Sequence, residues 1–328
     1  MNFFKIILVV FICVLPLSAK MIISVSVLPQ AFFVKQIAGN LVDVNIMVPK
    51  GKSPETYEPS IKQLQELSKS SLYFNIGMPF EKAWLERFKA VNPNMKIIPP
   101  LEQSDFNAYL DTFSEHNKEG DRGDFLHNHN QDSTHNIYKH NSRDSVIKSK
   151  QDPMINTHKH NKLESNHINH AHEPHIWLSF ILSKYHIKQI ANSLIDLDSA
   201  NADIYKQNLE KILQRIDVLY NESKKKLETK NKSFLVYHPA YSYIANELGL
   251  VEYSIERDGK EAKITHTKEI LEIIKKHNIK TIFIQPQFSQ KNALAIAKEA
   301  KLKVEMNDPL AYEWLDNLEK FIDLLANN

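Results

Sequence analysis

Short apolar segments rich in β-branched residues alternate, in the first third of the chain, with longer segments whose apolar residues recur at helical spacing. The clearest helical segment is 80–91, whose apolar residues fall on one side: Phe80, Trp84, Leu85 and Phe88. Strands are expected at 22–28, 42–48, 71–76 and 95–98, and helices at 31–37, after the N-cap residue Ser60 and at 80–91. This alternation predicts a parallel sheet covered by helices on both faces.

The last third of the chain repeats the same alternation. Strands are expected at 233–237, 251–255, 281–284 and 304–306, and helices at 241–248, 267–277, 289–301 and 313–325. A further helix, at 179–197, is expected earlier in the chain. The fold class predicted from the sequence is therefore α/β, with two lobes that are each a parallel sheet covered by helices. We place the N-terminal lobe at 20–110 and 173–198, and the C-terminal lobe at 230–328.

A longer helix is expected between the two lobes, at 199–228. Its apolar residues lie on roughly one face: Ile204, Leu209, Ile212, Ile216 and Leu219. At roughly 1.5 Å per residue such a helix runs about 45 Å, which is enough to span two lobes as a rigid strut.

The apolar pattern stops from about Gln103 to His172. Asn, Asp, Ser, Lys and His dominate this tract, and ten of the 15 histidines lie between His116 and His172. Such a composition cannot bury enough apolar surface to offset the entropy of ordering the chain. We therefore predict a His-rich disordered insertion and place its bounds at 111–172.

The first 19 residues have the features of a secretory signal peptide. Lys5 provides the positive flank, an apolar run covers 6–17, and Ala19 is a small residue at a suitable cleavage point. The run is shorter than the roughly 20 apolar residues of a membrane-spanning helix. The single cysteine, Cys13, lies inside it after the bulky Ile12, which disfavours a lipid-anchor signal. We expect a periplasmic protein whose mature chain has no thiolate, so that any metal is held by nitrogen and oxygen.

Three of the four candidate ligands are predicted to follow strands. His238 follows the strand at 233–237, Asp308 follows the one at 304–306, and Glu55 lies in the loop after 42–48. Parallel sheets bind ligands beyond the carboxyl ends of their strands. His175 begins the ordered chain after the insertion, so a cleft between lobes can gather all four. Two imidazoles and two carboxylates form a plausible set for zinc or manganese.

Histidines in the insertion suggest a second, flexible mode of metal capture, since His-rich tracts are a recognised metal-binding composition. They occur as two close pairs and a trio: His127, His129, His158, His160, His167, His170 and His172.

Other function classes have less support. The formal net charge is +2 and no basic patch is set among aromatic residues, so we expect no nucleic-acid partner. A secreted zinc hydrolase is an alternative, with Glu58 or Glu173 as the base, but no His-Glu-x-x-His or Gly-x-Ser-x-Gly pattern occurs. A metal-storage protein or adhesin is a third class.

Five motifs in this order carry a resemblance to a known family: 53–59 (SPETYEP), 174–178 (PHIWL), 238–243 (HPAYSY), 285–288 (QPQF) and 308–310 (DPL). The chain resembles the metal-binding substrate-binding proteins of bacterial ABC importers for zinc and manganese. The resemblance implies two α/β lobes joined by one long helix, metal bound between them, and a membrane permease as partner. It also implies that the His-rich tract is the loop found in many zinc-type members.

Glu55 departs from the family motif, which usually has a histidine at this position, whereas His175, His238 and Asp308 match the other metal positions. A carboxylate can ligate zinc, yet it is harder and anionic and shifts the preference toward manganese or iron. Alternatively, a loop histidine or a water takes the place of the ligand at position 55. Independently of this, the fourth position, at Asp308, is open or water-filled in zinc-type relatives. Our leading hypothesis is a monomeric carrier, not an enzyme, that captures Zn²⁺ for an ABC permease, with Mn²⁺ or Fe²⁺ as the alternative cargo.

Overall fold

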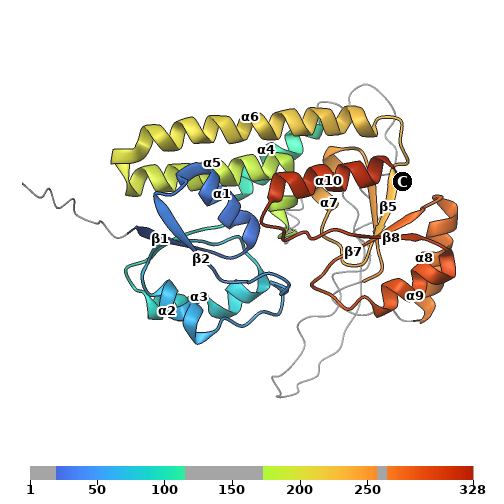
Figure 1. Cartoon of the computed structure of the whole chain (residues 1–328), viewed down its shortest axis with the longest axis horizontal. Coiled ribbons are helices and arrows are strands. Elements are labelled where there is room, and N and C mark those ends of the chain that lie inside the picture. Colours follow the sequence, from blue (N-terminus) through green and yellow to red (C-terminus); the bar gives the residue numbers. More distant parts are fainter. Residues whose placement is uncertain (1–19, 115–172, 257–263, 328) are drawn as a thin grey trace, which may run out of the picture.

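The computed structural model describes residues 20–114, 173–256 and 264–327, and these residues form two four-stranded parallel sheets side by side (Figure 1). The predicted signal peptide and the insertion histidines lie outside the described residues. The two-lobed α/β fold predicted from the sequence is confirmed. No helix in the described part of the chain combines the length and apolarity needed to cross a membrane.

The N-terminal sheet has the strand order β2-β1-β3-β4. Its strands are β1 (Met21–Val25), β2 (Val42–Ile46), β3 (Ser70–Phe74) and β4 (Lys96–Ile98), and β1 runs in register with β2 from Met21↔Val42 to Val25↔Ile46. Helix α1 (Leu28–Ala38) lies on one side of the sheet, while α2 (Ile61–Leu67) and α3 (Pro79–Val91) lie on the other (Figure 1).

The expected first strand was too long at its C-terminal end. Leu28 begins α1, with Pro29 in the first turn of the helix. A proline there loses no helical hydrogen bond, since the first N–H groups of a helix have no partner within it. Pro29 therefore marks the start of the helix and not merely the end of a strand.

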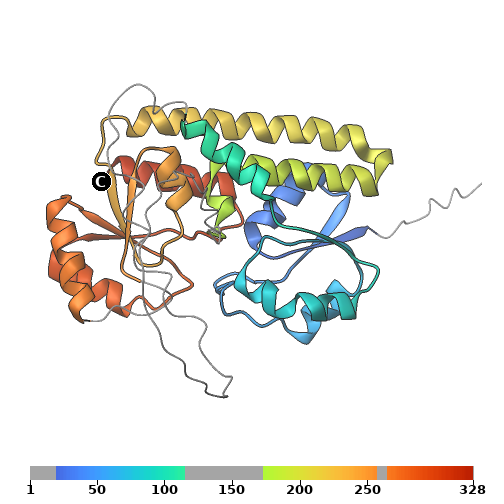
Figure 2. The same cartoon turned by 180° about the vertical axis from the view of Figure 1, so that it is seen from behind.

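The C-terminal sheet repeats the arrangement, with the strand order β6-β5-β7-β8. Its strands are β5 (Ser233–Val236), β6 (Val251–Ser254), β7 (Thr281–Ile284) and β8 (Lys303–Met306). The helices of this lobe are α7 (Ser242–Glu247), α8 (Ile264–Lys276), α9 (Lys291–Ala300) and α10 (Trp314–Ala326). Figure 2 shows α8 and α9 on the outer side of this sheet.

Regular structure continues beyond Gln103, so the prediction that it stops there is wrong. Residues Gln103–Ser114 form α4, which contacts α5 (Phe180–Leu197) and places Tyr109 against Tyr243 of α7. Its inward face is narrow: Phe106 and Tyr109 are buried and Phe113 is partly buried. These three aromatic residues at i, i+3 and i+7 are a sparse stripe in a polar composition.

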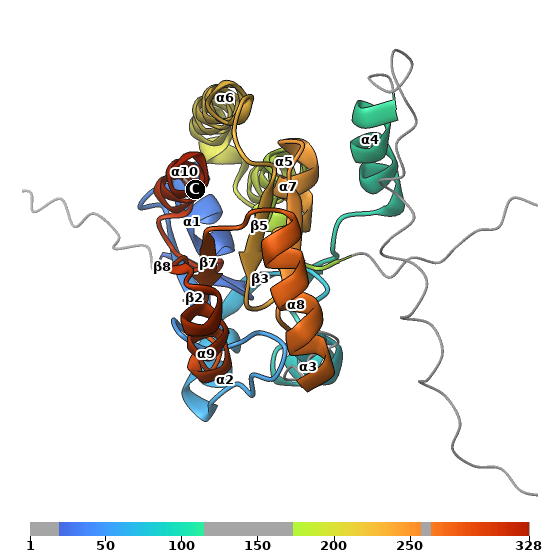
Figure 3. The ribbon, with the colours of Figure 1, turned by 90° about the vertical axis from the view of Figure 1, so that its right-hand side faces the viewer.

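Helix α6 (Ala202–Leu227, 26 residues) runs along one side of both lobes (Figures 1 and 2). It packs on α1 and α5, which belong to the N-terminal lobe, and on α10, which belongs to the C-terminal lobe. A short 3-10 turn, η3 (Ser199–Asn201), precedes it. The expected strut between lobes is therefore present, and it is embedded in a layer of helices seen end-on in Figure 3.

One hydrophobic core extends across both lobes. It joins residues of β1 and β3 to residues of α1, α5, α6 and α10 and to Phe234 and Phe283 of the second sheet, while a smaller core lies between that sheet and α8 and α9. Phe33 of α1 packs edge-on against Trp314 of α10, with ring centroids 5.0 Å apart. The two sheets are therefore joined through a layer of helices that packs on both.

Candidate metal centre

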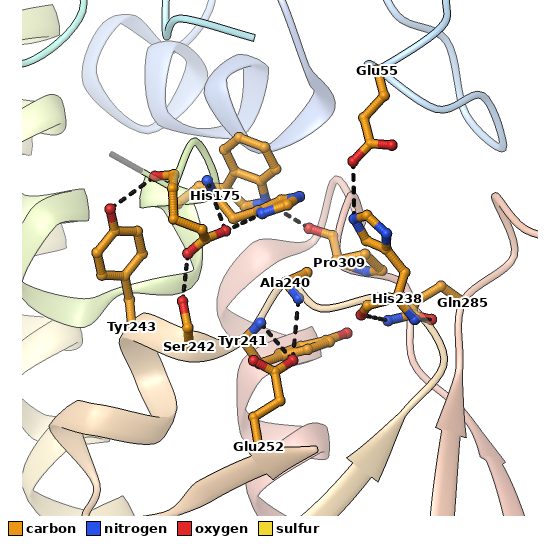
Figure 4. Close-up of polar contacts among 12 residues, drawn as sticks. Glu55, His175, His238, Ala240, Tyr241, Ser242, Tyr243, Glu252, Gln285 and Pro309 are labelled. Carbon is orange, nitrogen blue, oxygen red and sulfur yellow. Dashed lines mark hydrogen bonds and ion pairs between the residues drawn. The ribbon is translucent and has the colours of Figure 1, made fainter. Parts of the chain in front are cut away.

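Glu55, His175 and His238 come together between the lobes (Figure 4). The pocket that contains them is also lined by Gln287, Phe288 and Pro309. Each of the three offers one ligand atom, and these atoms lie within 4.8 Å of one another. Both histidines are buried, at 7% and 6% exposure, and Glu55 is half-buried. One ion can therefore meet ligands from the N-terminal lobe, the segment after the insertion and the C-terminal lobe.

The loop after β2 presents Glu55. Its Ser53 hydroxyl accepts a hydrogen bond from the Glu55 N–H at 3.3 Å, and the Pro54 carbonyl accepts one from the Phe80 N–H at the start of α3. Gln63 of α2 donates to the carbonyls of Ile46 and Met47 at the start of this loop. These bonds fold the proline-containing loop toward the second lobe.

His175 precedes the buried 3-10 turn η2 (Ile176–Leu178), which fixes its direction. The His175 carbonyl accepts from the Leu178 N–H at 2.9 Å. The indole N–H of Trp177 donates to the Pro309 carbonyl at 2.8 Å, and the indole N–H of Trp314 donates to the Trp177 carbonyl at 2.6 Å. Two tryptophans thus tie the His175 segment to the C-terminal lobe.

His238 follows β5, and contacts to its backbone and to its ring fix its position. The Gln285 amide both accepts from the His238 N–H, at 3.1 Å, and donates to the His238 carbonyl, at 2.7 Å. The Phe288 ring stacks on the imidazole with centroids 4.4 Å apart. The buried Glu252 carboxyl accepts the N–H groups of Ala240 and Tyr241, and burial raises its pKa to about 8. Figure 4 shows the polar contacts of Gln285 with His238 and of Glu252 with Ala240 and Tyr241.

Each imidazole contacts a carboxylate through its Nδ1 atom. The Nδ1 atom of His175 contacts Glu173, and Nδ1 of His238 lies 2.9 Å from Glu256 Oε2. The Ser242 hydroxyl and the Tyr243 hydroxyl hold Glu173 in turn, through its carboxylate and its carbonyl. Because a carboxylate accepts only, it selects the Nδ1–H tautomer and leaves Nε2 to face an ion.

The carboxylates around His238 favour the protonated form of its imidazole. Burial alone lowers the pKa of His238, but the hydrogen bonds to Glu256 and Glu55 and the charges of both carboxylates outweigh burial and raise it to about 9. The Glu55 carboxylate, whose Oε1 lies 3.1 Å from His238 Nε2, has its pKa lowered by that hydrogen bond. Any ion held by both Glu55 and His238 Nε2 must therefore displace the proton that lies between them.

Asp308, the expected fourth ligand, lies outside this group of three. Its Oδ1 accepts from Gln287 Nε2 at 2.6 Å and from the Leu310 N–H at 2.9 Å. Its role as a ligand stays a prediction.

The insertion histidines fall outside the described residues: His127, His129, His158, His160, His167, His170 and His172.

Sequence reasoning missed Glu256 and the partnership of Glu173 with His175. Glu256 is 18 residues from His238, at the end of a neighbouring strand, and only the sheet order β6-β5 brings the two together. Glu173 lies two residues before His175, so its spacing was visible, but the turn that folds it back was not.

The donor set suits a divalent cation that prefers nitrogen and oxygen. Two imidazole nitrogens and one carboxylate match the ligands of zinc or manganese. Three protein ligands leave one position of a four-coordinate ion for another donor.

The family model of the zinc-uptake complex component A, periplasmic, matches residues 23–328. The chain belongs to this family. The resemblance found in the sequence motifs is thereby confirmed. A solved structure described as the crystal structure of ZnuA is 31% identical, with a TM-score of 0.70, and the match covers 94% of this chain and 99% of that one.

Curated members of the family are more distant in sequence. The high-affinity zinc uptake system protein ZnuA of Bacillus subtilis is 24% identical over 92% of this chain and 82% of its own length. The zinc-binding protein AdcA of Streptococcus pyogenes is 26% identical over 86% of this chain and 49% of its own length. The chain thus spans about half the length of the AdcA relatives.

Proposed function

We propose that this protein captures Zn²⁺ between its lobes, at Glu55, His175 and His238, and delivers it to the membrane permease of an ABC importer. It acts outside the cytoplasm as a monomer, by binding and not by catalysis. The observation that carries the proposal is the convergence of two buried imidazoles and one carboxylate from three separate parts of the chain. Membership of the zinc-uptake family supports the cargo and the partner.

A carrier fits the carboxylates of the site better than a hydrolase does. A catalytic zinc needs a nearby general base that is free to take a proton from water. Glu173 and Glu256, the carboxylates beside the imidazoles, are instead engaged with the Nδ1 atoms of His175 and His238. Their role is to orient ligands, so hydrolysis by the zinc-loaded protein should not exceed that of free zinc.

Manganese is the second candidate cargo, because Glu55 gives the site a hard, anionic ligand. Replacing it with the softer imidazole in Glu55→His should raise the preference for zinc over manganese. Competition between the two metals for one site measures this. An unchanged preference would mean that Glu55 does not touch the ion.

The insertion histidines serve, in this proposal, to collect zinc at low concentration. Deleting residues 115–169 should weaken capture from dilute zinc while leaving one tight site. Loss of the tight site on deletion would instead assign one of its ligands to the insertion.

Zinc titration in competition with a chelator tests the site. His175→Ala and His238→Ala should each lower affinity by at least about 100-fold, since each removes a ligand from a small set. His277→Ala is the matched control, because His277 contacts Tyr253 away from the pocket. Tight binding retained in both ligand variants would refute the site.

A further inference from the structure

Gln287 holds the single buried side-chain polar atom without a hydrogen-bond partner among the described residues, its Oε1. A buried acceptor left unpaired costs free energy, so each such atom in a native fold calls for a physical reason such as a water or an ion. Every other fully buried side-chain nitrogen and oxygen in the described ranges has a partner. The exception lies in the lining of the pocket that also contains Glu55, His175 and His238.

The orientation of this amide is fixed by chemistry. Its Nε2 donates to Asp308 Oδ1 at 2.6 Å. A carboxylate cannot donate, so the amide cannot turn its oxygen toward Asp308 without losing this bond. Oε1 is therefore held on the side of the amide away from Asp308.

Asp308 is itself held firmly. Its Oδ1 also accepts the Leu310 N–H at 2.9 Å, and its carbonyl accepts from Asn317 Nδ2 of α10 at 2.9 Å. Gln287 follows β7 and Asp308 follows β8, its neighbour in the sheet, so both lie at the edge that carries His238. Phe288, the next residue after Gln287, stacks on the His238 ring.

We propose that the Gln287 side-chain oxygen faces the fourth coordination position of the metal, and that Asp308 is the residue that positions it. The oxygen either binds the ion directly or accepts a hydrogen bond from a water bound there. This inference rests on the proposed zinc site. It assigns to Asp308 a role one step away from the ion, in place of ligation, and so explains why its Oδ1 is directed to Gln287.

The two assignments for Asp308 differ in the charge that they place around the ion. With neutral imidazoles and a neutral amide, Glu55 is the one anionic ligand, and a divalent ion keeps a net positive charge. Ligation by Asp308 would add a second anionic ligand, whereas its Oδ1 is the acceptor of the hydrogen bond from Gln287 Nε2.

Variants of the full-length protein separate these roles through zinc affinity in chelator competition. Gln287→Leu should lower the affinity about tenfold or more, the range seen for residues that support metal ligands. Gln290→Leu is the matched control, because Gln290 lies three residues further along and does not line the pocket. Equal affinity of Gln287→Leu and wild type would overturn the inference.

Asp308 variants test whether it acts through Gln287. Asp308→Asn keeps an oxygen that can accept from Nε2, so affinity should stay within about threefold of wild type. Asp308→Ala should weaken binding as much as Gln287→Leu, and the double variant should be no weaker than either one, since coupled residues are not additive. A loss in Asp308→Asn as large as in His238→Ala would make Asp308 a ligand and overturn its positioning role.

A crystal structure of the zinc-loaded protein gives the direct readout. Gln287 Oε1 should lie about 2.0–2.2 Å from the ion, or about 2.7–3.0 Å from a water bound to it. An amide turned away from the ion overturns the inference while the three-ligand site stands. Zinc absent from Glu55, His175 and His238 would instead refute the proposed function on which the inference rests.

Discussion

At the scale of single residues, Glu256 illustrates how a carboxylate prepares a ligand. It fixes the Nδ1–H tautomer of His238 from 2.9 Å away while remaining 6% exposed. Glu256→Gln keeps the acceptor but removes the charge, so zinc affinity should fall about tenfold. Chelator competition measures this, with Glu305→Gln as a control on a strand outside the pocket. An affinity equal to that of wild type would show that orientation alone, without charge, suffices.

His186 gives a pH prediction that is independent of metal. Burial lowers its pKa to about 4, and its ring contacts Gln30 and Gln189. Between about pH 6.5 and 4 the unfolded chain binds a proton there and the folded protein does not. Stability from this group is therefore complete above about pH 6.5 and is lost as the pH falls through that window.

The measurement compares wild type with His186→Gln by chemical unfolding at several pH values. The wild type should lose up to roughly 3 kcal/mol more than the variant between pH 6.5 and 4. Comparison of the two proteins cancels the contribution of Glu247, whose pKa burial raises to about 7 and which acts in the opposite direction. A constant difference across this range would contradict a neutral, buried imidazole.

At the scale of elements, η2 connects the candidate site to the second lobe. The Trp177 indole donates to the Pro309 carbonyl in the buried interior. Trp177→Phe leaves that carbonyl unpaired, so the free energy of unfolding should fall by about 1–3 kcal/mol. Zinc affinity should also fall, because His175 precedes the turn. Unfolding curves and chelator competition on the same samples measure both effects, and a loss of stability with unchanged affinity would show that η2 does not position His175.

The elements were predictable where the apolar pattern was dense. The eight strands and the long helix stand out because β-branched runs and helical periodicity are local properties. Helix α4 was missed because its inward stripe consists of Phe106, Tyr109 and Phe113 in polar surroundings, and its stability comes from packing on α5 and α7. Tertiary contacts of this kind leave little trace in a local pattern.

The sequence predicts a candidate site residue where that residue follows a strand whose end can itself be predicted. Glu55 and His238 could be placed near one another because both follow parallel strands. The position of Glu256 beside His238 depends on which strands are neighbours, and the role proposed for Gln287 depends on an amide orientation that Asp308 sets. Neither dependence can be read from spacing along the chain.

At the scale of the whole molecule, the core shared by both lobes predicts a single unfolding event. It runs from β1 and β3 through the helical layer to Phe234 and Phe283. Neither lobe can lose its interior without exposing that of the other, so thermal unfolding followed by calorimetry and by tryptophan fluorescence should give coincident transitions. Two separated transitions would show that the lobes fold as independent units.

We propose that Glu55, His175 and His238 together form one tight zinc site. The most direct test is the metal content of the full-length protein after it is offered equal Zn²⁺ and Mn²⁺ and dialysed against a moderate chelator. We expect one retained zinc per chain in the wild type and in His277→Ala, and none in His238→Ala. Retention of zinc by His238→Ala, or retention of manganese by the wild type, would contradict it.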